Sequence, residues 1–69
     1  MTNEKLLIEA YRETIENIQR QRVEIFKDIK RLKEINESNP CRKEYGKLAS
    51  LLSKIKGIRK AALKENINV

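Results

Sequence analysis

A seven-residue repeat of apolar side chains constrains the fold more than any other feature of this sequence. The repeat has two apolar positions, one filled by Ile8, Ile15 and Ile29 and the other by Tyr11, Ile18, Ile25 and Leu32. This spacing places the side chains on one stripe of an α-helix and is typical of a coiled-coil seam. Charged residues make up 38% of the chain and aromatic residues 4%, a balance that favours long helices over strands. We therefore expect an all-α fold.

A second heptad pattern follows the only proline, Pro40. It consists of Leu48, Leu51, Ile55, Ile58 and Ala62. The proline ring disfavours helical geometry for Asn39, so we predict Asn39 as the N-cap and Pro40 as the first helical residue. The predicted elements are a helix at about residues 3–37, a turn at 37–39 and a helix at about 40–66. Because the turn is short, we expect an antiparallel two-helix coiled-coil hairpin that forms a single domain over residues 1–69.

The two predicted helices have unequal lengths, about 52 Å and about 40 Å. Folding the chain at the turn places Ile29 near Leu51 and leaves the start of the first helix without a partner. A chain of this size buries only about 60% of its unfolded surface, so self-association into a helical bundle is expected. We predict that the interface with a second copy or a protein partner includes Leu7, Ile8, Tyr11 and Ile15.

Arg22 interrupts the aliphatic seam of the first helix. A polar residue at a core position can set the register or the oligomeric state, and on that hypothesis Arg22 belongs to the predicted interface. The alternative is that its long side chain runs along the edge of the seam and keeps the guanidinium in solvent.

The net charge of +6 comes entirely from the second half of the chain. Up to Glu37, eight basic residues are balanced by eight acidic ones, whereas from Ser38 onward eight basic residues face two acidic ones. The candidate basic face of the second helix is formed by Arg42, Lys43, Lys47, Lys54, Lys56 and Lys60. It could bind a phosphate backbone or an acidic protein, or it could be solvated surface.

Gly57 and Cys41 each leave two alternatives open. If Gly57 opens a tight turn, residues 48–63 form a helix-turn-helix; otherwise the second helix is continuous. Cys41 lies beside Arg42 and Lys43, a setting that favours a reactive thiol, or it is a small residue at an exposed turn.

The residue inventory argues against catalysis. One Cys, no His and no Trp exclude a disulfide framework, a Cys/His zinc site and a histidine-based active site. We therefore expect no enzyme activity, no cofactor and no metal. The longest uninterrupted apolar run is far too short to cross a membrane, and a cytoplasmic protein without membrane contact is expected.

The sequence EKLLIEAY at residues 4–11 resembles the start of the small helical-hairpin inhibitors of sporulation histidine kinases. The resemblance implies a hairpin that binds a larger protein. It covers eight of 69 residues, and the turn lies much later here, so no binding residue is transferred. The two-helix outline is also similar to a ribosomal protein of the large subunit, although the second helix lacks the basic motif of that family.

Two functions remain open at this point. The first is a non-enzymatic helical protein-interaction module, a small regulator, inhibitor or scaffold that acts as a homo-oligomer, most simply a homodimer. The alternative is a DNA- or RNA-binding protein that uses the basic second helix. They differ in the surface that matters, the apolar amino-terminal end or the basic face.

Overall fold

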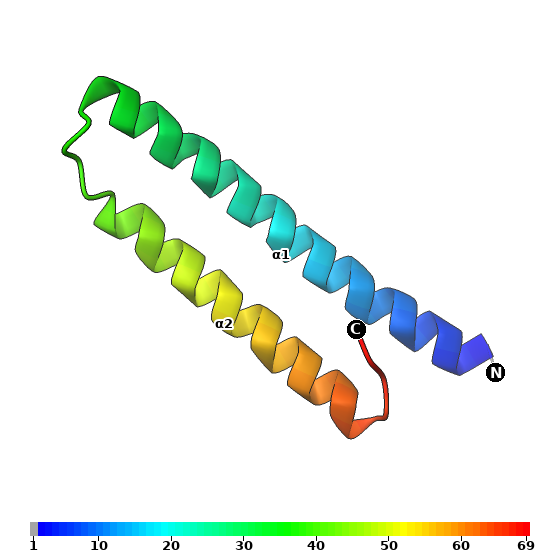
Figure 1. The fold of residues 1–69 in the computed structure, drawn as a ribbon. Coiled ribbons are helices and arrows are strands. Elements are labelled where there is room, and N and C mark those ends of the chain that lie inside the picture. Colours follow the sequence, from blue (N-terminus) through cyan, green and yellow to red (C-terminus); the bar gives the residue numbers. More distant parts are fainter. Residues whose placement is uncertain (1) are drawn as a thin grey trace.

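The computed structural model describes residues 2–69, apart from the side chain of Thr2, as two antiparallel helices joined by a short connection (Figure 1). Helix α1 spans Thr2–Ile35 and helix α2 spans Arg42–Lys64. Residues 2–69 include no strand. The prediction of an all-α, two-helix hairpin is therefore confirmed.

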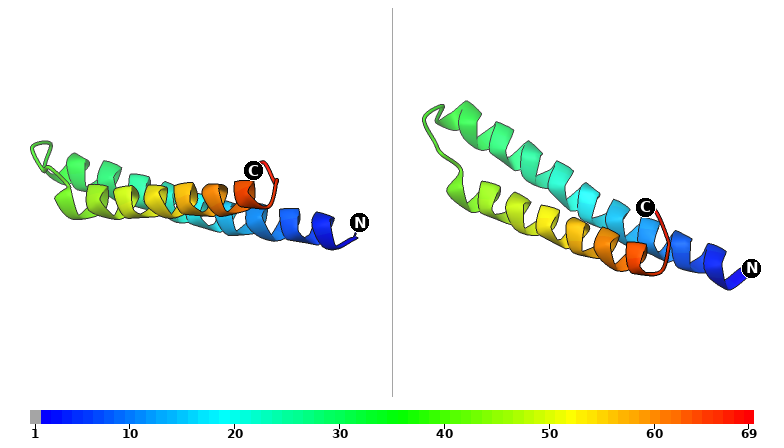
Figure 2. Two further views of the ribbon diagram at one scale, coloured as in Figure 1. Left: turned by 90° about the horizontal axis from the view of Figure 1, so that it is seen from below. Right: turned by 60° about the horizontal axis from the view of Figure 1, so that its bottom comes forward.

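The molecule is long and thin, with principal extents of 53 × 17 × 12 Å. Helix α1 has 34 residues and α2 has 23, so the amino-terminal end of α1 extends beyond α2. After α2 the chain reverses (Figures 1 and 2), and its last residue, Val69, packs against the core cluster that includes Ile15 and Ile18 of α1. The hairpin is thus closed by a turn at one end and by a returning tail at the other.

Apolar side chains between the two helices form the core in two clusters. The first contains Ile15, Ile18, Leu51 and Ile55, and the second contains Ile29, Cys41 and Leu48. Ile25 packs against both clusters and joins them into one row. Among the described residues no polar or charged residue is buried.

Cys41, and not Asn39, is the N-cap residue of α2, so the predicted start of this helix was wrong. The Asn39 side chain accepts a hydrogen bond from the Cys41 amide at 2.9 Å, which holds Pro40 outside the helix. The backbone of Cys41 has a left-handed conformation, with φ 49° and ψ 42°. This conformation directs its side chain into the cluster with Ile29 and Leu48. Core packing therefore decides where α2 begins.

Helix α2 ends in a Schellman motif. The Ile67 amide donates to the Ala62 carbonyl at 2.9 Å, and the Asn66 amide donates to the Leu63 carbonyl at 3.0 Å. Asn66 has φ 62°, a left-handed conformation that asparagine tolerates better than most residues. The motif buries Ile67 and turns the chain toward α1, where Val69 packs against the first core cluster.

The helices are displaced by about one turn from the predicted pairing. Ile29 clusters with Leu48, whereas its expected partner Leu51 clusters with Ile15 and Ile18. At the turn end this pairing is held by Cys41, which packs with Ile29 and Leu48, and the connection spans residues 36–41 where a turn at 37–39 was predicted. As a result α2 reaches further along α1 toward its amino-terminal end.

The first prediction concerns Ile55, which is only 2% exposed. Ile55→Ala should lower the free energy of unfolding by about 2–5 kcal/mol, and the milder Ile55→Val by about 0.5–1.5 kcal/mol, because each leaves a cavity in the core. Urea titration followed by circular dichroism at fixed protein concentration measures the change. The control is Leu63→Ala, at a side chain 60% exposed. An equal loss in Leu63→Ala would contradict the described core.

Candidate interaction surfaces

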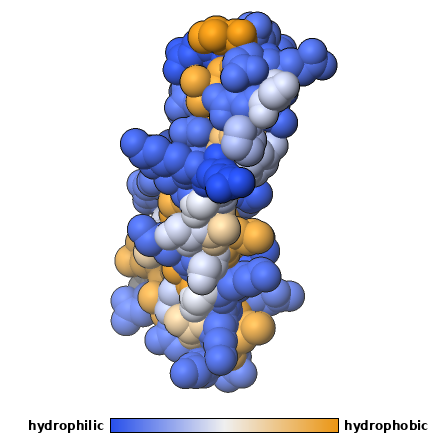
Figure 3. Space-filling model, turned by 90° about the vertical axis from the view of Figure 1, so that its left-hand side faces the viewer, coloured by the Kyte–Doolittle hydropathy of each residue, from blue (hydrophilic) through white to orange (hydrophobic). Residues whose placement is uncertain are grey.

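Several large apolar side chains remain exposed on both helices. Among the described residues these are Leu6, Leu7, Val23, Phe26, Ile35, Tyr45, Leu52 and Leu63. The side of the molecule in Figure 3 accordingly shows apolar surface in several places between hydrophilic side chains. The single seam of the hairpin therefore does not cover all the apolar residues of the chain.

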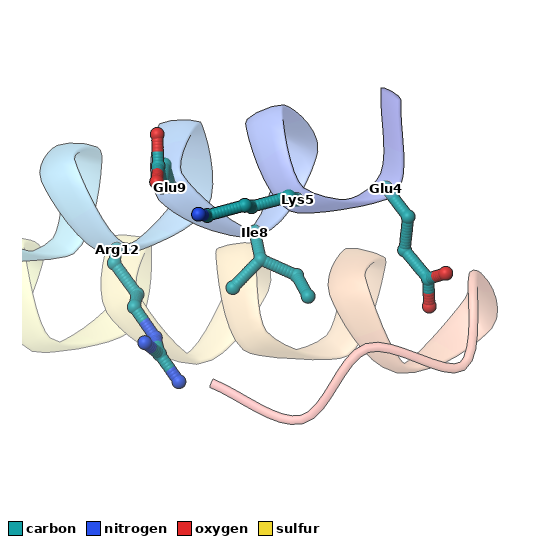
Figure 4. Close-up of a pocket in the computed structure, with 5 residues that line it drawn as sticks. All are labelled: Glu4, Lys5, Ile8, Glu9 and Arg12. Atoms are coloured by element: carbon teal, nitrogen blue, oxygen red, sulfur yellow. The ribbon is translucent and has the colours of Figure 1, made fainter. Parts of the chain in front are cut away.

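The first surface is the amino-terminal overhang, defined as residues 2–10 of α1. Leu6 is 61% exposed, Leu7 is exposed and Ile8 is half-buried. Ile8 lies in an open groove that is also lined by Glu4, Lys5, Glu9 and Arg12 (Figure 4). Leu7 and Ile8 are thus accessible to a partner at least in part, and their place in an interface stays a prediction.

Tyr11 and Ile15 do have partners within the hairpin, so the prediction that they are unpaired was wrong. The Tyr11 hydroxyl donates a hydrogen bond to Glu65 Oε2 at 2.6 Å. Ile15 is buried with Ile18, Leu51 and Ile55. Both contacts follow from the further reach of α2 along α1. The overhang is therefore shorter than the sequence predicted.

The hydrogen bond to Glu65 raises the pKa of Tyr11 above its ordinary value of 10.0. The bond requires the protonated hydroxyl, and desolvation and the negative charge of Glu65 add to the shift in the same direction. Tyr11 and Glu65 therefore join the start of α1 to the end of α2 most firmly while the phenol is neutral.

Arg22 is half-buried and runs from the seam toward Phe26. Its Cζ lies 5.9 Å from the centroid of the Phe26 ring, a distance at which a cation and an aromatic ring attract each other. Its Nε is buried without a hydrogen-bond partner. The side chain thus runs toward Phe26 beside the seam, but its buried Nε does not fit a guanidinium kept in solvent, and any effect on register stays a prediction.

A second surface, missed in the sequence analysis, lies across both helices. The Lys33 Nζ is 5.9 Å from the centroid of the Tyr45 ring, so these two sides of α1 and α2 are adjacent. Phe26 lies seven residues before Lys33, and Leu52 lies seven residues after Tyr45, so both are on the same side as that contact. We call Val23, Phe26, Tyr45 and Leu52 the two-helix apolar face.

The sequence did contain a signal for this face. Val23 directly follows the seam position Arg22, Phe26 follows Ile25, and Leu52 follows Leu51. An apolar residue beside the two seam positions widens the apolar stripe of a helix beyond what a single partner helix covers.

The third surface is the basic face of α2. Its six predicted residues are all exposed: Arg42, Lys43, Lys47, Lys54, Lys56 and Lys60. The ion pairs within residues 2–69 lie on α1, where Lys27 meets Glu24 at 3.5 Å and Arg31 meets Asp28 at 2.8 Å. Lys47 and Lys54 share a groove with Gln21 and Ser50. The basic face therefore presents its charges without acidic partners from the described part of the chain.

Helix α2 runs unbroken through Gly57, so the helix-turn-helix alternative is wrong. A side chain added at Gly46 or Gly57 would meet nothing within 4 Å. No contact within the hairpin therefore requires glycine at these positions. The local helical pattern of α2 outweighs the tendency of an isolated glycine to break it.

Cys41 is 2% exposed, so the interpretation of a small residue at an exposed turn is wrong. Its neighbours Ile29 and Leu48 cover it. The left-handed backbone, which the sequence analysis did not anticipate, is the reason that the thiol faces the core.

No known protein family, curated protein or solved structure matches this chain. Across residues 2–69, neither helix is long and apolar enough to cross a membrane, and no three His, Cys, Asp or Glu side chains gather where they could hold a metal ion.

The second prediction concerns Tyr11. In a Tyr45→Phe background, ultraviolet titration of the remaining phenol should give a pKa above 10.0, and Glu65→Ala should bring it back toward that value. Because the folded chain holds the phenolic proton more tightly than the unfolded chain, this contact stabilises the fold below about pH 10 and is lost as the pH rises through the raised pKa. Unchanged titration in Glu65→Ala would contradict the hydrogen bond.

Proposed function

We propose that this protein is a non-enzymatic helical interaction module, a small regulator, inhibitor or scaffold that works as a homo-oligomer in the cytoplasm. Its two helices would pair as an antiparallel coiled coil and leave surfaces for other chains. The protein has no histidine and one cysteine, which limits the chemistry available to it. Binding a larger protein is the activity that these surfaces support best.

The observation that carries this proposal is the amino-terminal overhang. Helix α1 continues past the Tyr11–Glu65 contact and presents Leu6 and Leu7 to solvent on a regular helix. Exposed apolar groups of this kind, rimmed by charged side chains such as Lys5 and Glu9, are typical of protein interaction sites. An exposed helix of this sort can dock in an apolar groove of a partner.

The third prediction tests the overhang. The immobilised protein should retain a protein partner from a nuclease-treated lysate of its own cells, and the double variant Leu6→Ser, Leu7→Ser should reduce the affinity about 30-fold or more, as expected for interface anchors. The control is Leu63→Ser, which removes an equally exposed leucine from α2. Equal retention by the double variant would reject the overhang as the binding surface.

A second candidate function is nucleic-acid binding through the basic face of α2. The observation that favours it is the set of exposed cations, since α2 carries eight basic residues and one acidic residue. A helix with this charge attracts a phosphate backbone, and the affinity would come mainly from released counterions. Contacts of this kind position a protein without reading sequence.

The fourth prediction tests this alternative. If the basic face binds nucleic acid, log Kd should change with log salt by about 0.9 for each phosphate neutralised. Reversing Lys47, Lys54, Lys56 and Lys60 to Glu should abolish binding while helicity is kept, because all four side chains are exposed. The charge-matched control reverses Lys5, Arg20, Lys27 and Lys30 on α1. Equal loss in both variants would reject the basic face and indicate an effect of net charge alone.

A further inference from the structure

The side chains of the two-helix apolar face remain exposed in the isolated hairpin, where Arg22 lies over Phe26 and Lys33 lies over Tyr45. Val23 is 51% exposed, Phe26 49%, Tyr45 46% and Leu52 39%. We propose that this face binds the same face of a second copy of the chain, so that two hairpins form a four-helix bundle. The inference rests on the proposed homo-oligomer and assigns the surface through which it forms, in place of the overhang.

The width of the apolar stripe on each helix argues for a second partner. A helix that packs against one other helix needs apolar residues at only two positions in seven. Phe26 and Leu52 occupy a third position beside the seam residues Ile25 and Leu51. A stripe of three positions is the width that helices bury when they face two neighbours in a bundle. In this hairpin the third position is apolar only near the middle, at Phe26 on α1 and at Tyr45 and Leu52 on α2, and on the same side of both helices. Further along, the same position holds Gln19 and Lys33 on α1 and Arg59 on α2.

The exposed area of the chain is large enough for an interface with a second copy. The chain exposes 5675 Å². A compact monomer of 8.1 kDa exposes about 4,500 Å², so this hairpin exposes roughly 1,200 Å² more than its mass requires. A stable dimer buries about 800 Å² per partner. The excess is spread over an elongated molecule of 53 × 17 × 12 Å, and it is larger than the area that each partner of such a dimer buries.

The arrangement of the face makes it complementary to itself. It lies across two antiparallel helices, and its central residues Phe26 and Leu52 come one from each helix. A two-fold axis near these residues brings the same apolar side chains of both copies together, as in a closed dimer. The overhang belongs to α1 alone, so it offers a second copy one helix instead of two.

The charges of the helices select how the two copies meet. Helix α2 has eight basic residues and one acidic residue, whereas α1 has eight basic and seven acidic residues. Packing α2 against α2 would bring two strongly basic helices together, which is unfavourable. The arrangement that avoids this contact places α1 of each copy against α2 of the other. The basic faces then lie apart in the bundle.

The fifth prediction is that sedimentation equilibrium finds a dimer of the wild-type protein and that Phe26→Glu and Leu52→Glu each raise its Kd about 30-fold or more, since either variant buries a charge in the interface. The control is Leu6→Glu, in the overhang, which should leave the dimer intact. A dimer that survives both Phe26→Glu and Leu52→Glu would overturn this face and leave the homo-oligomer standing. A wild-type monomer at high micromolar concentration would overturn both.

A conservative variant keeps the test informative if a glutamate variant fails to fold. The chain has no tryptophan, so Phe26→Trp introduces a single reporter on the face. Its fluorescence should shift to shorter wavelength as the protein concentration rises through the Kd, because dimerisation removes the ring from water. Leu6→Trp should show no such shift. A spectrum of Phe26→Trp that stays independent of concentration, in a sample that sediments as a dimer, would overturn the proposal.

Discussion

The hairpin depends on one row of apolar contacts between its two helices. With two helices there is a single seam, so each helix can cover the other only along one stripe of side chains. Ile25 connects the two clusters of that row, and Ile55 is its most deeply buried aliphatic residue. The turn and the carboxyl-terminal tail close the two ends of this row. The apolar side chains that the row does not cover remain exposed on the helices.

Both ends are closed by a residue with a left-handed backbone. Cys41 has φ 49° at the turn, and Asn66 has φ 62° after α2, and they are the non-glycine residues with positive φ among those described. Such a backbone costs about 1–2 kcal/mol for most residues. At each end a buried side chain accompanies it, Cys41 itself at one end and Ile67 at the other. Burial of apolar surface at the ends offsets this local strain.

The heptad pattern was sufficient to predict two antiparallel helices, because apolar spacing is a local property of the chain. The register was not predictable, since it depends on Cys41 entering the core instead of the helix beginning at Pro40. The same displacement gave Tyr11 and Ile15 partners that the sequence could not indicate. The two-helix apolar face was predictable from Phe26 and Val23 beside the seam, whereas its pairing with Tyr45 required the structure.

The buried position of Cys41 makes its thiol a built-in reporter of local opening. A thiol-specific reagent needs access to the sulfur, and Ile29 and Leu48 withhold it while the turn end of the core is intact. When reclosing is faster than the reaction, the labelling rate measures the equilibrium population of molecules with this end open. The only cysteine of the chain therefore allows the opening of one end of the hairpin to be followed separately from its global unfolding.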